Sequence, residues 1–131
     1  MYLDANFFIL LNFDYKDKGE KARQILDQIV KGKSAVTSVL TLDEVMWVIV
    51  KNKQEKELRN IIEEIYSIKN LVIKDVSNSI PLIALDIMER NKLRPRDAFH
   101  LAVMKVLGIN TLVSDDKDFD KIQGIKRIRL D

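Results

Sequence analysis

Short apolar runs alternate along the chain with longer segments whose apolar residues recur at helical spacing. The short runs lie at residues 1–3, 34–37, 71–73 and 111–113, and a short last strand is expected at 127–130. Strands that are apolar throughout, rather than on alternate residues, are buried on both faces, and strands separated by helices pair in parallel. The pattern therefore predicts an α/β fold in three layers, with helices on both faces of a parallel sheet.

The intervening segments predict helices at residues 18–31, about 42–50, 54–66, 77–90 and 94–107. Gly32 and Gly108 end two of them, and Pro81 and Pro95 lie in first turns, where a missing N–H costs little. The helix at 94–107 is apolar on nearly every side, so we expect it to be deeply buried. We interpret the aromatic residues at helical core spacing as packing residues, with a dimer face as the alternative place for Phe8 or Trp47; they are Phe7, Phe8, Trp47 and Phe99.

The composition limits what kind of protein this is. With 131 residues, only 4 Gly and 2 Pro, the chain fits a single domain at 1–131 with one core. The absence of Cys excludes disulfides and thiolate-bound zinc and is compatible with a reducing cytoplasm. No run is apolar enough to span a bilayer, and no signal-peptide pattern is present. We therefore expect a cytoplasmic protein with no membrane partner.

Acidic residues follow the predicted strands or begin the helices after them. Asp4 directly follows the first strand, Glu44 lies early in the helix after the second, and Asp97 lies in the first turn of the buried helix. Three more acids follow the fourth strand: Asp115, Asp116 and Asp118. Since the carboxyl ends of parallel strands meet at one edge of a sheet, these acids are candidates for a common site.

Each acid also has a local explanation. Thr41 and Glu44 match a capping box, in which Glu44 satisfies only a backbone N–H. Asp97 is favoured by the helix dipole or by Arg94. The acids at 115–118 are compatible with a turn that caps a short helix at 117–122. Asp4 is the hardest to explain locally, because strand ends seldom place an acid between apolar runs without a partner.

A shared acidic pocket would need a cation. Two carboxylates about 4 Å apart repel by roughly 4 kcal/mol at an effective dielectric constant near 20, so several together become protonated or bind a metal. Oxygen ligands without Cys or clustered His select Mg²⁺ or Mn²⁺ over zinc. Because His100 is the only histidine, no Ser-His-Asp or Cys-His catalytic arrangement competes with this site. His100 lies one helical turn after Asp97 and is either a buried core residue or a residue that contacts a carboxylate or a phosphate.

The net charge is only +2, which is small for a nucleic-acid-binding protein. If the acids are gathered in one pocket, however, the remaining surface is basic. Two groups of basic residues fit that picture: Arg90, Lys92, Arg94 and Arg96 and, later in the chain, Lys126, Arg127 and Arg129. Taken one at a time, each of these residues is better explained as a charged residue at a solvated helix end.

Four segments, taken in order, resemble the motifs of PIN-domain nucleases and, within them, of VapC-like toxin ribonucleases. The first is Asp4-Ala5-Asn6, similar to the opening Asp-x-Asn/Ser after strand one. Thr37-Ser38 with Glu44 resembles the second acidic position, and residues 96–102 resemble the third. Residues 114–119 resemble the closing Thr-x-Asp-x-Asp-Phe, with Ser114 in place of Thr. The resemblance spans essentially the whole chain.

This resemblance implies a PIN-like fold with a five-stranded parallel sheet. It also implies a Mg²⁺- or Mn²⁺-dependent endoribonuclease that hydrolyses RNA phosphodiester bonds, as the toxin of a type II toxin–antitoxin pair. The implied partners are RNA, a cognate antitoxin peptide and a second copy in a homodimer. The implied metal-binding and catalytic residues are Asp4, Glu44, Asp97 and Asp116, with Asn6, Ser114 and Asp118 as auxiliary residues and Arg94 and Arg96 as RNA contacts.

Other functions remain open at this point. The chain is compatible with a stand-alone RNA-processing nuclease of the same family, or with a module that binds RNA or a partner without cleaving. A phosphoacceptor or phosphatase of the response-regulator or haloacid-dehalogenase kind also places Asp at strand ends. That alternative fits poorly, because the dehalogenase pattern requires Asp where this chain has Asn6.

Overall fold

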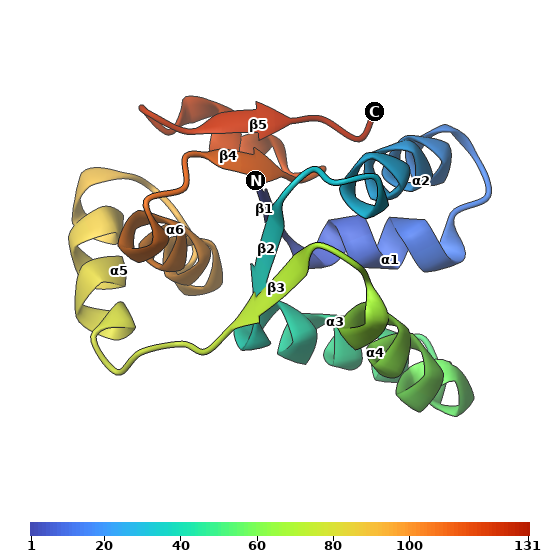
Figure 1. Ribbon diagram of the computed structural model, residues 1–131. Helices are drawn as coiled ribbons and strands as arrows, with labels where there is room; N and C mark the ends of the chain where they lie inside the picture. The colour runs from blue at the N-terminus through green and yellow to red at the C-terminus, as the bar shows by residue number, and fades with distance from the viewer.

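Five parallel strands form one central sheet in the computed structural model, which describes residues 1–131 (Figure 1). Their order is β3-β2-β1-β4-β5, so the first strand lies in the middle. The strands are β1 (Tyr2–Leu3), β2 (Ala35–Ser38), β3 (Leu71–Lys74), β4 (Thr111–Val113) and β5 (Lys126–Ile128). The predicted α/β fold with a five-stranded parallel sheet is confirmed.

Six α-helices and two short 3₁₀ helices surround the sheet. They are α1 (Ala5–Phe13), α2 (Asp17–Val30), α3 (Val39–Lys51), η1 (Glu55–Glu57), α4 (Leu58–Ser67), α5 (Ile80–Arg90), α6 (Pro95–Leu107) and η2 (Lys117–Lys121). Helices α1–α4 lie on one side of the sheet and α5 and α6 on the other (Figure 1). The helix at 94–107 is buried as predicted, over the stretch from Ala98 to Met104 except for the half-buried Phe99.

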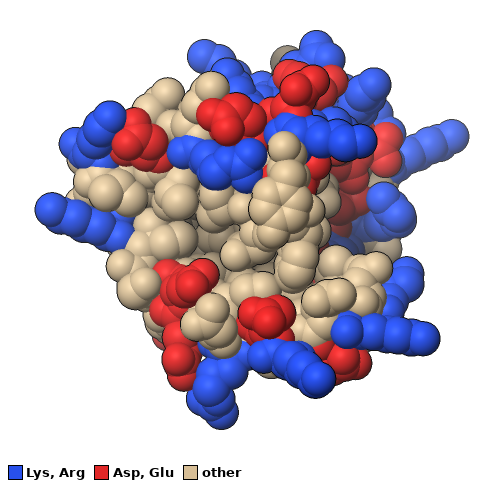
Figure 2. Space-filling model, turned by 90° about the vertical axis from the view of Figure 1, so that its right-hand side faces the viewer, with Lys and Arg blue, Asp and Glu red and all other residues tan.

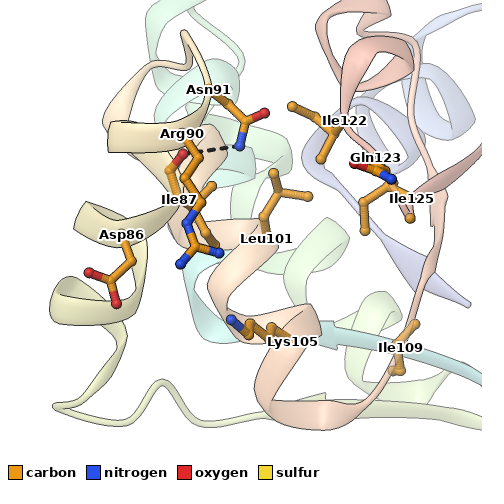
Figure 3. A pocket seen from close by; sticks show the side chains of 11 residues that line it. Asp86, Ile87, Arg90, Asn91, Leu101, Lys105, Ile109, Ile122, Gln123 and Ile125 are labelled. Carbon is orange, nitrogen blue, oxygen red and sulfur yellow. Dashed lines mark hydrogen bonds between the residues drawn. The ribbon is translucent and has the colours of Figure 1, made fainter.

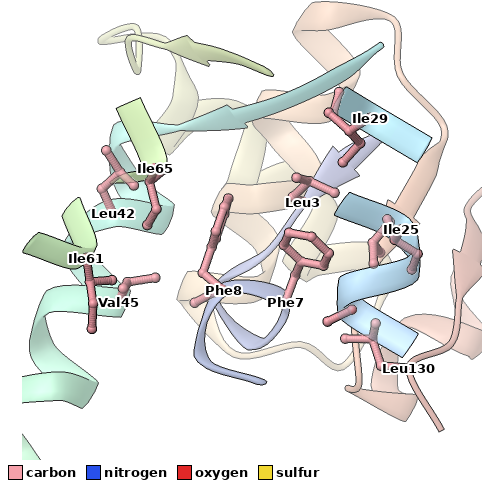
Figure 4. Close-up of a cluster of buried hydrophobic side chains, with 14 of the residues drawn as sticks. Leu3, Phe7, Phe8, Ile25, Ile29, Leu42, Val45, Ile61, Ile65 and Leu130 are labelled. Carbon is pink, nitrogen blue, oxygen red and sulfur yellow. The ribbon is translucent and has the colours of Figure 1, made fainter. Parts of the chain in front are cut away.

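Each face of the sheet has its own apolar core, because successive strand residues point to opposite faces. Leu3 packs with Phe7 and Phe8 of α1 and with residues of α2, α3 and α4 (Figure 4). Tyr2, its neighbour on β1, packs with α5 and α6 on the other face. Because both faces are covered, the central strands β1 and β4 are buried and mainly apolar, which is the signal that identified them in the sequence.

Two helices differ from the sequence-based expectation. The patterns above assign no element to residues 5–13, yet these form α1, whose buried residues are Ala5, Phe7 and Phe8. Helix α3 begins at Val39 rather than near Leu42, and its Trp47 is exposed on the surface rather than packed in the core. The interpretation of Trp47 as a core residue is therefore wrong, since it faces away from the sheet and Lys51 lies over its ring at 4.7 Å.

Because the strands are parallel, the carboxyl ends of β1, β2 and β4 lie at the same edge of the sheet. Asp4 follows β1, Ser38 ends β2, and Ser114 follows β4; all three residues are buried. Helix α1 starts directly after Asp4 and α3 directly after Ser38, so this edge is where two helices begin. No helix of the structure is both long and apolar enough to cross a membrane.

Candidate active site

Asp4 is the N-cap of α1. Its Oδ1 accepts a hydrogen bond from the backbone N–H of Phe7 at 3.1 Å, and its own backbone N–H donates to the Val113 carbonyl at 3.3 Å. An Asp at this position satisfies one of the free N–H groups at the start of the helix. The side chain is therefore fixed between β1, β4 and α1, and only 6 % of its surface is exposed.

Glu44 points inward from the second turn of α3. Because α3 begins at Val39, Glu44 lies too far into the helix for the capping box proposed with Thr41. Its Oε1 instead accepts a hydrogen bond from His100 Nε2 at 2.6 Å, and the Arg96 Nε lies 3.6 Å from the same oxygen. The capping interpretation is wrong, and Glu44 belongs to the edge of the sheet where Asp4 lies.

Asp97 and Asp116 bring two more carboxylates to this edge. Asp97 lies in the first turn of α6, with the Arg94 Nε 3.6 Å from its Oδ2. Asp116 caps η2 by accepting a hydrogen bond from the Asp118 N–H at 2.9 Å, and its Oδ2 is 3.8 Å from the Arg94 Nη2. The local explanations for these two acids therefore hold, but both side chains also face the common site.

The four predicted acids line one small cavity of about 60 Å³. Its other lining residues are Ala5, Asn6, His100 and Phe119. A wider hollow of about 650 Å³ shares Asn6 and three of the acids and extends to Leu40, Phe99 and the residues Arg94-Pro95-Arg96. Residues from positions 4 to 116 of the chain thus meet at the carboxyl edge of the sheet, as the sequence predicted.

Burial disfavours negative charge in this site more than repulsion between the acids does. Burial raises the pKa of the Asp4 carboxyl to about 6, despite the lowering effect of the Ser114 hydroxyl and the Phe7 amide. Burial also raises the pKa of Asp97, with the charge of Asp116 adding to the shift and Arg94 opposing it. Both shifts mean that the negative charge is poorly compensated by the protein.

The donor set fits a hard divalent cation. All four acids supply oxygen, which Mg²⁺ and Mn²⁺ prefer, and Oδ2 of Asp97 is buried without a hydrogen-bond partner. No three acidic or histidine side chains are arranged closely enough to hold an ion as they stand. His100 holds Glu44 through Oε1 alone, so a cation would have to bring the free Oε2 of Glu44 and the other carboxylates within bonding distance of one another.

The auxiliary residues lie at different distances from this cavity. Ser114 is fully buried, and its hydroxyl accepts a hydrogen bond from the Asp116 N–H at 3.0 Å, which fixes the turn after β4. Asn6 lines both hollows, but no hydrogen bond joins it to Asp4. Asp118 does not line the cavity: its carboxylate is half exposed and lies 3.4 Å from Lys121. Asp115 is bound by Lys18 at 2.7 Å.

Arg94 and Arg96 flank the wider hollow and remain largely exposed, at 77 % and 52 % of their side-chain surface. They are the cations nearest to the acids. Arg127 and Arg129, which the sequence also grouped with the basic residues, are instead paired with Asp120 and Asp131. The basic surface at the site is therefore narrower than the sequence suggested.

Another hollow, of about 480 Å³, lies between α5, α6 and the segment after η2 (Figure 3). Its walls include Ile87, Leu101 and Ile122, and Asp86 is its only acid. It therefore lacks the chemistry of the acidic cavity.

Sequence reasoning did not find the polar residues beneath the acids. Tyr2 is fully buried, and its hydroxyl lies 2.7 Å from the Ser38 Oγ, 3.3 Å from the Thr41 Oγ1 and 2.9 Å from the His100 Nδ1. In the sequence, Tyr2 reads as one residue of an apolar strand. The only clue in the sequence was a single histidine together with the hydroxyl residues Ser38 and Thr41. These residues are far apart in the chain, and only the folded structure shows that they meet at Tyr2.

The PIN domain family model matches residues 1–125 of the 131. The chain belongs to the PIN-domain family. This PIN domain is also 25% identical over 127 residues to ribonuclease VapC13 of Mycobacterium tuberculosis, covering 96% of this chain and 97% of that protein.

Solved structures share the fold of this PIN domain. One is VapBC2 of Rickettsia felis bound to a promoter DNA fragment, with a TM-score of 0.79 and 15% identity over 98% of this chain and 96% of that one. Another is VapC20 of M. tuberculosis, a Sarcin-Ricin loop cleaving toxin, with a TM-score of 0.76 and 18% identity over 91% and 92% of the two chains.

Proposed function

We propose that this PIN domain is a Mg²⁺- or Mn²⁺-dependent endoribonuclease that hydrolyses RNA phosphodiester bonds. The observation that carries the proposal is the convergence of Asp4, Glu44, Asp97 and Asp116 on one cavity, with poorly compensated negative charge on Asp4 and Asp97. The ribonuclease names of its similar relatives point to the same chemistry.

The four acids would hold the cation between them, with Asp4 and Asp116 fixed by the helices that they cap. When bound, such an ion lowers the pKa of water and stabilises negative charge on a phosphate. Arg94 and Arg96 flank the approach to the acids and are suited to bind the RNA backbone, because phosphate contacts from Arg position a nucleic acid without reading its sequence. Ser114 would keep Asp116 in place through its backbone hydrogen bond.

The test is cleavage of a labelled RNA by the purified chain with Mn²⁺, Mg²⁺ or EDTA. Asp4→Asn and Asp97→Asn should abolish cleavage while circular dichroism remains unchanged. Asp115→Asn is the matched control, because this acid lies next to Asp116 but is paired with Lys18 outside the cavity. Full cleavage by Asp4→Asn, or cleavage that is unaffected by EDTA, would refute the proposal.

A second candidate is a module that binds RNA or a partner without cleaving. It is favoured by one observation, that no three of the acids are close enough together to hold an ion as they stand. Isothermal titration with Mn²⁺ separates the two: the nuclease should bind the ion with an affinity that Asp97→Asn abolishes, whereas the module should show no such binding.

We also propose that the chain is the toxin of a type II toxin–antitoxin pair, by analogy with its VapC-like relatives, and that it forms a homodimer. Figure 2 shows the side of the molecule where α1–α4 lie, with uncharged side chains in its centre and charged ones along its edges. Helix α3 exposes Met46, Trp47 and Val50, which form an apolar surface of the kind that a partner protein covers. An RNA-processing role without an antitoxin is the alternative.

Trp47 is the only tryptophan, so its fluorescence reports on this surface alone. Dimer formation or binding of an antitoxin peptide over α3 should shift its emission to shorter wavelength. Analytical ultracentrifugation at the same concentrations distinguishes the two. A monomer whose emission stays that of exposed tryptophan with a candidate antitoxin would count against this part of the proposal.

A further inference from the structure

A chain of buried hydrogen bonds connects the middle of the sheet to the acidic cavity. It runs from Ser38 and Thr41 to the Tyr2 hydroxyl, from there to the His100 Nδ1, and from the His100 Nε2 to the Glu44 Oε1. Tyr2 and His100 are 0% and 2% exposed, so water does not compete for these bonds. His100 thus links the buried hydroxyls of Tyr2, Ser38 and Thr41 to Glu44, a carboxylate of the cavity.

The chemistry of the groups determines where the imidazole proton lies. An ionised carboxylate only accepts hydrogen bonds, so the 2.6 Å contact to Glu44 requires the proton on Nε2. In the neutral ring, Nδ1 is then an acceptor, and the Tyr2 hydroxyl at 2.9 Å is its donor. Burial raises the pKa of Tyr2 to about 12, so this hydroxyl keeps its proton. The hydroxyls of Ser38 and Thr41 can donate to the oxygen of Tyr2.

Glu44 depends on this contact for its orientation. Its side chain is long and leaves the second turn of α3, and its only other partner is the half-exposed Arg96, at 3.6 Å from the same Oε1. No hydrogen bond is made to Oε2. The contact from His100 therefore occupies one oxygen and leaves the other available.

We propose that His100 is a positioning residue, which the Tyr2 hydroxyl keeps as the Nε2–H tautomer so that it holds Glu44 Oε1 and leaves Oε2 for the cation. This role rests on the proposed function, because it assigns a purpose to the orientation of Glu44. Replacing a residue that orients a metal-binding side chain typically lowers the metal affinity about 10- to 100-fold.

Two substitutions separate this role from a merely structural one. In His100→Gln the side-chain amide can reach the place of Nε2 and still donate to Glu44, whereas in His100→Asn it reaches only the place of Nδ1. Mn²⁺ affinity measured by isothermal titration should fall at least about 10-fold in His100→Asn and by much less in His100→Gln. Thermal unfolding in EDTA should be similar for the two variants, since both replace the same buried ring.

The tautomer is measured independently of any metal. Because the chain has a single His, the imidazole ¹⁵N spectrum contains one pair of signals. The unaltered protein should show a protonated Nε2 and an unprotonated Nδ1 in EDTA, and Tyr2→Phe should weaken this preference. If His100→Asn does not fold, Tyr2→Phe replaces it in the Mn²⁺ titration, with a smaller loss of affinity expected.

Equal loss of Mn²⁺ affinity in His100→Asn and His100→Gln would overturn the proposal, because the ring would then be a ligand or a packing residue. A protonated Nδ1 with an unprotonated Nε2 would overturn it as well. If the unaltered protein binds no Mn²⁺, the proposed function fails, and the ¹⁵N spectrum still decides whether His100 donates to Glu44.

Discussion

Replacing Asp4 by Asn should make the metal-free protein more stable and at the same time remove its response to metal. Asn keeps the N-cap, because its side-chain oxygen can accept the hydrogen bond from the Phe7 N–H as Asp4 does. What the substitution removes is the negative charge, which is buried and poorly compensated. The change therefore isolates the electrostatic cost of the site.

The pKa of Asp4 gives the size of this cost. It rises from 3.8 to about 6 on folding, and at about 1.4 kcal/mol per pKa unit this amounts to about 3 kcal/mol. Because the folded-state pKa is the higher one, the protonated carboxyl favours the folded state. The corresponding stability is fully present below about pH 3.8 and is lost as the pH rises through about 6.

The assay is urea unfolding in EDTA at pH 7.5 and pH 5, followed by circular dichroism. The free energy of unfolding of Asp4→Asn should be higher than that of the unaltered protein by about 3 kcal/mol at pH 7.5 and by about half of that at pH 5. Mn²⁺ should then stabilise the unaltered protein but not the variant. Asp118→Asn is the control, since its half-exposed carboxylate lies outside the cavity. A variant less stable than the unaltered protein at pH 7.5 in EDTA would refute the reasoning.

Three further predictions follow from the packing and the charges. Gly19→Ala should lower the free energy of unfolding by about 3 kcal/mol or more, because the added Cβ would lie 1.8 Å from the Asp14 carbonyl oxygen; Gly108→Ala, at φ 67° with open space around it, should cost only about 1 kcal/mol in the same urea titration. Phe8→Ala should cost about 3–5 kcal/mol, since Phe8 is fully buried, and unchanged unfolding would contradict the packing of α1. Arg94→Ala should weaken RNA binding and reduce its salt slope by about 1, measured by fluorescence anisotropy of uncleaved RNA in EDTA, whereas Arg129→Ala, paired with Asp131, should not.

The fold was predictable because its strands are buried on both faces. Mainly apolar runs marked β1 to β4, whereas β5 (Lys-Arg-Ile) is largely polar and lies at 126–128 rather than at the expected 127–130. Helix α1 was not predicted, because its apolar residues lie on all sides and leave no periodic pattern. The clue was Asp4, which is an N-cap as well as an acid at a strand end.

The candidate site was predictable as a set of residues but not as an arrangement. The carboxyl ends of parallel strands meet at one edge of a sheet, and this general property correctly predicted that the four acids lie together. It could not show that α3 begins at Val39, which decides that Glu44 faces His100 rather than the start of its own helix. Nor could it place Asp118, which the turn of η2 directs toward Lys121 and solvent. These details depend on where individual turns begin, which the spacing of residues does not fix.

The position of β1 in the middle of the sheet has a consequence for synthesis. Its neighbours are β2 and β4, so the strand made first cannot complete its pairing until residues 111–113 have left the ribosome. The cavity needs Asp116 as well. A nascent chain therefore keeps these acids apart from one another until Asp116 has emerged, so the acidic cavity cannot exist on any shorter nascent chain.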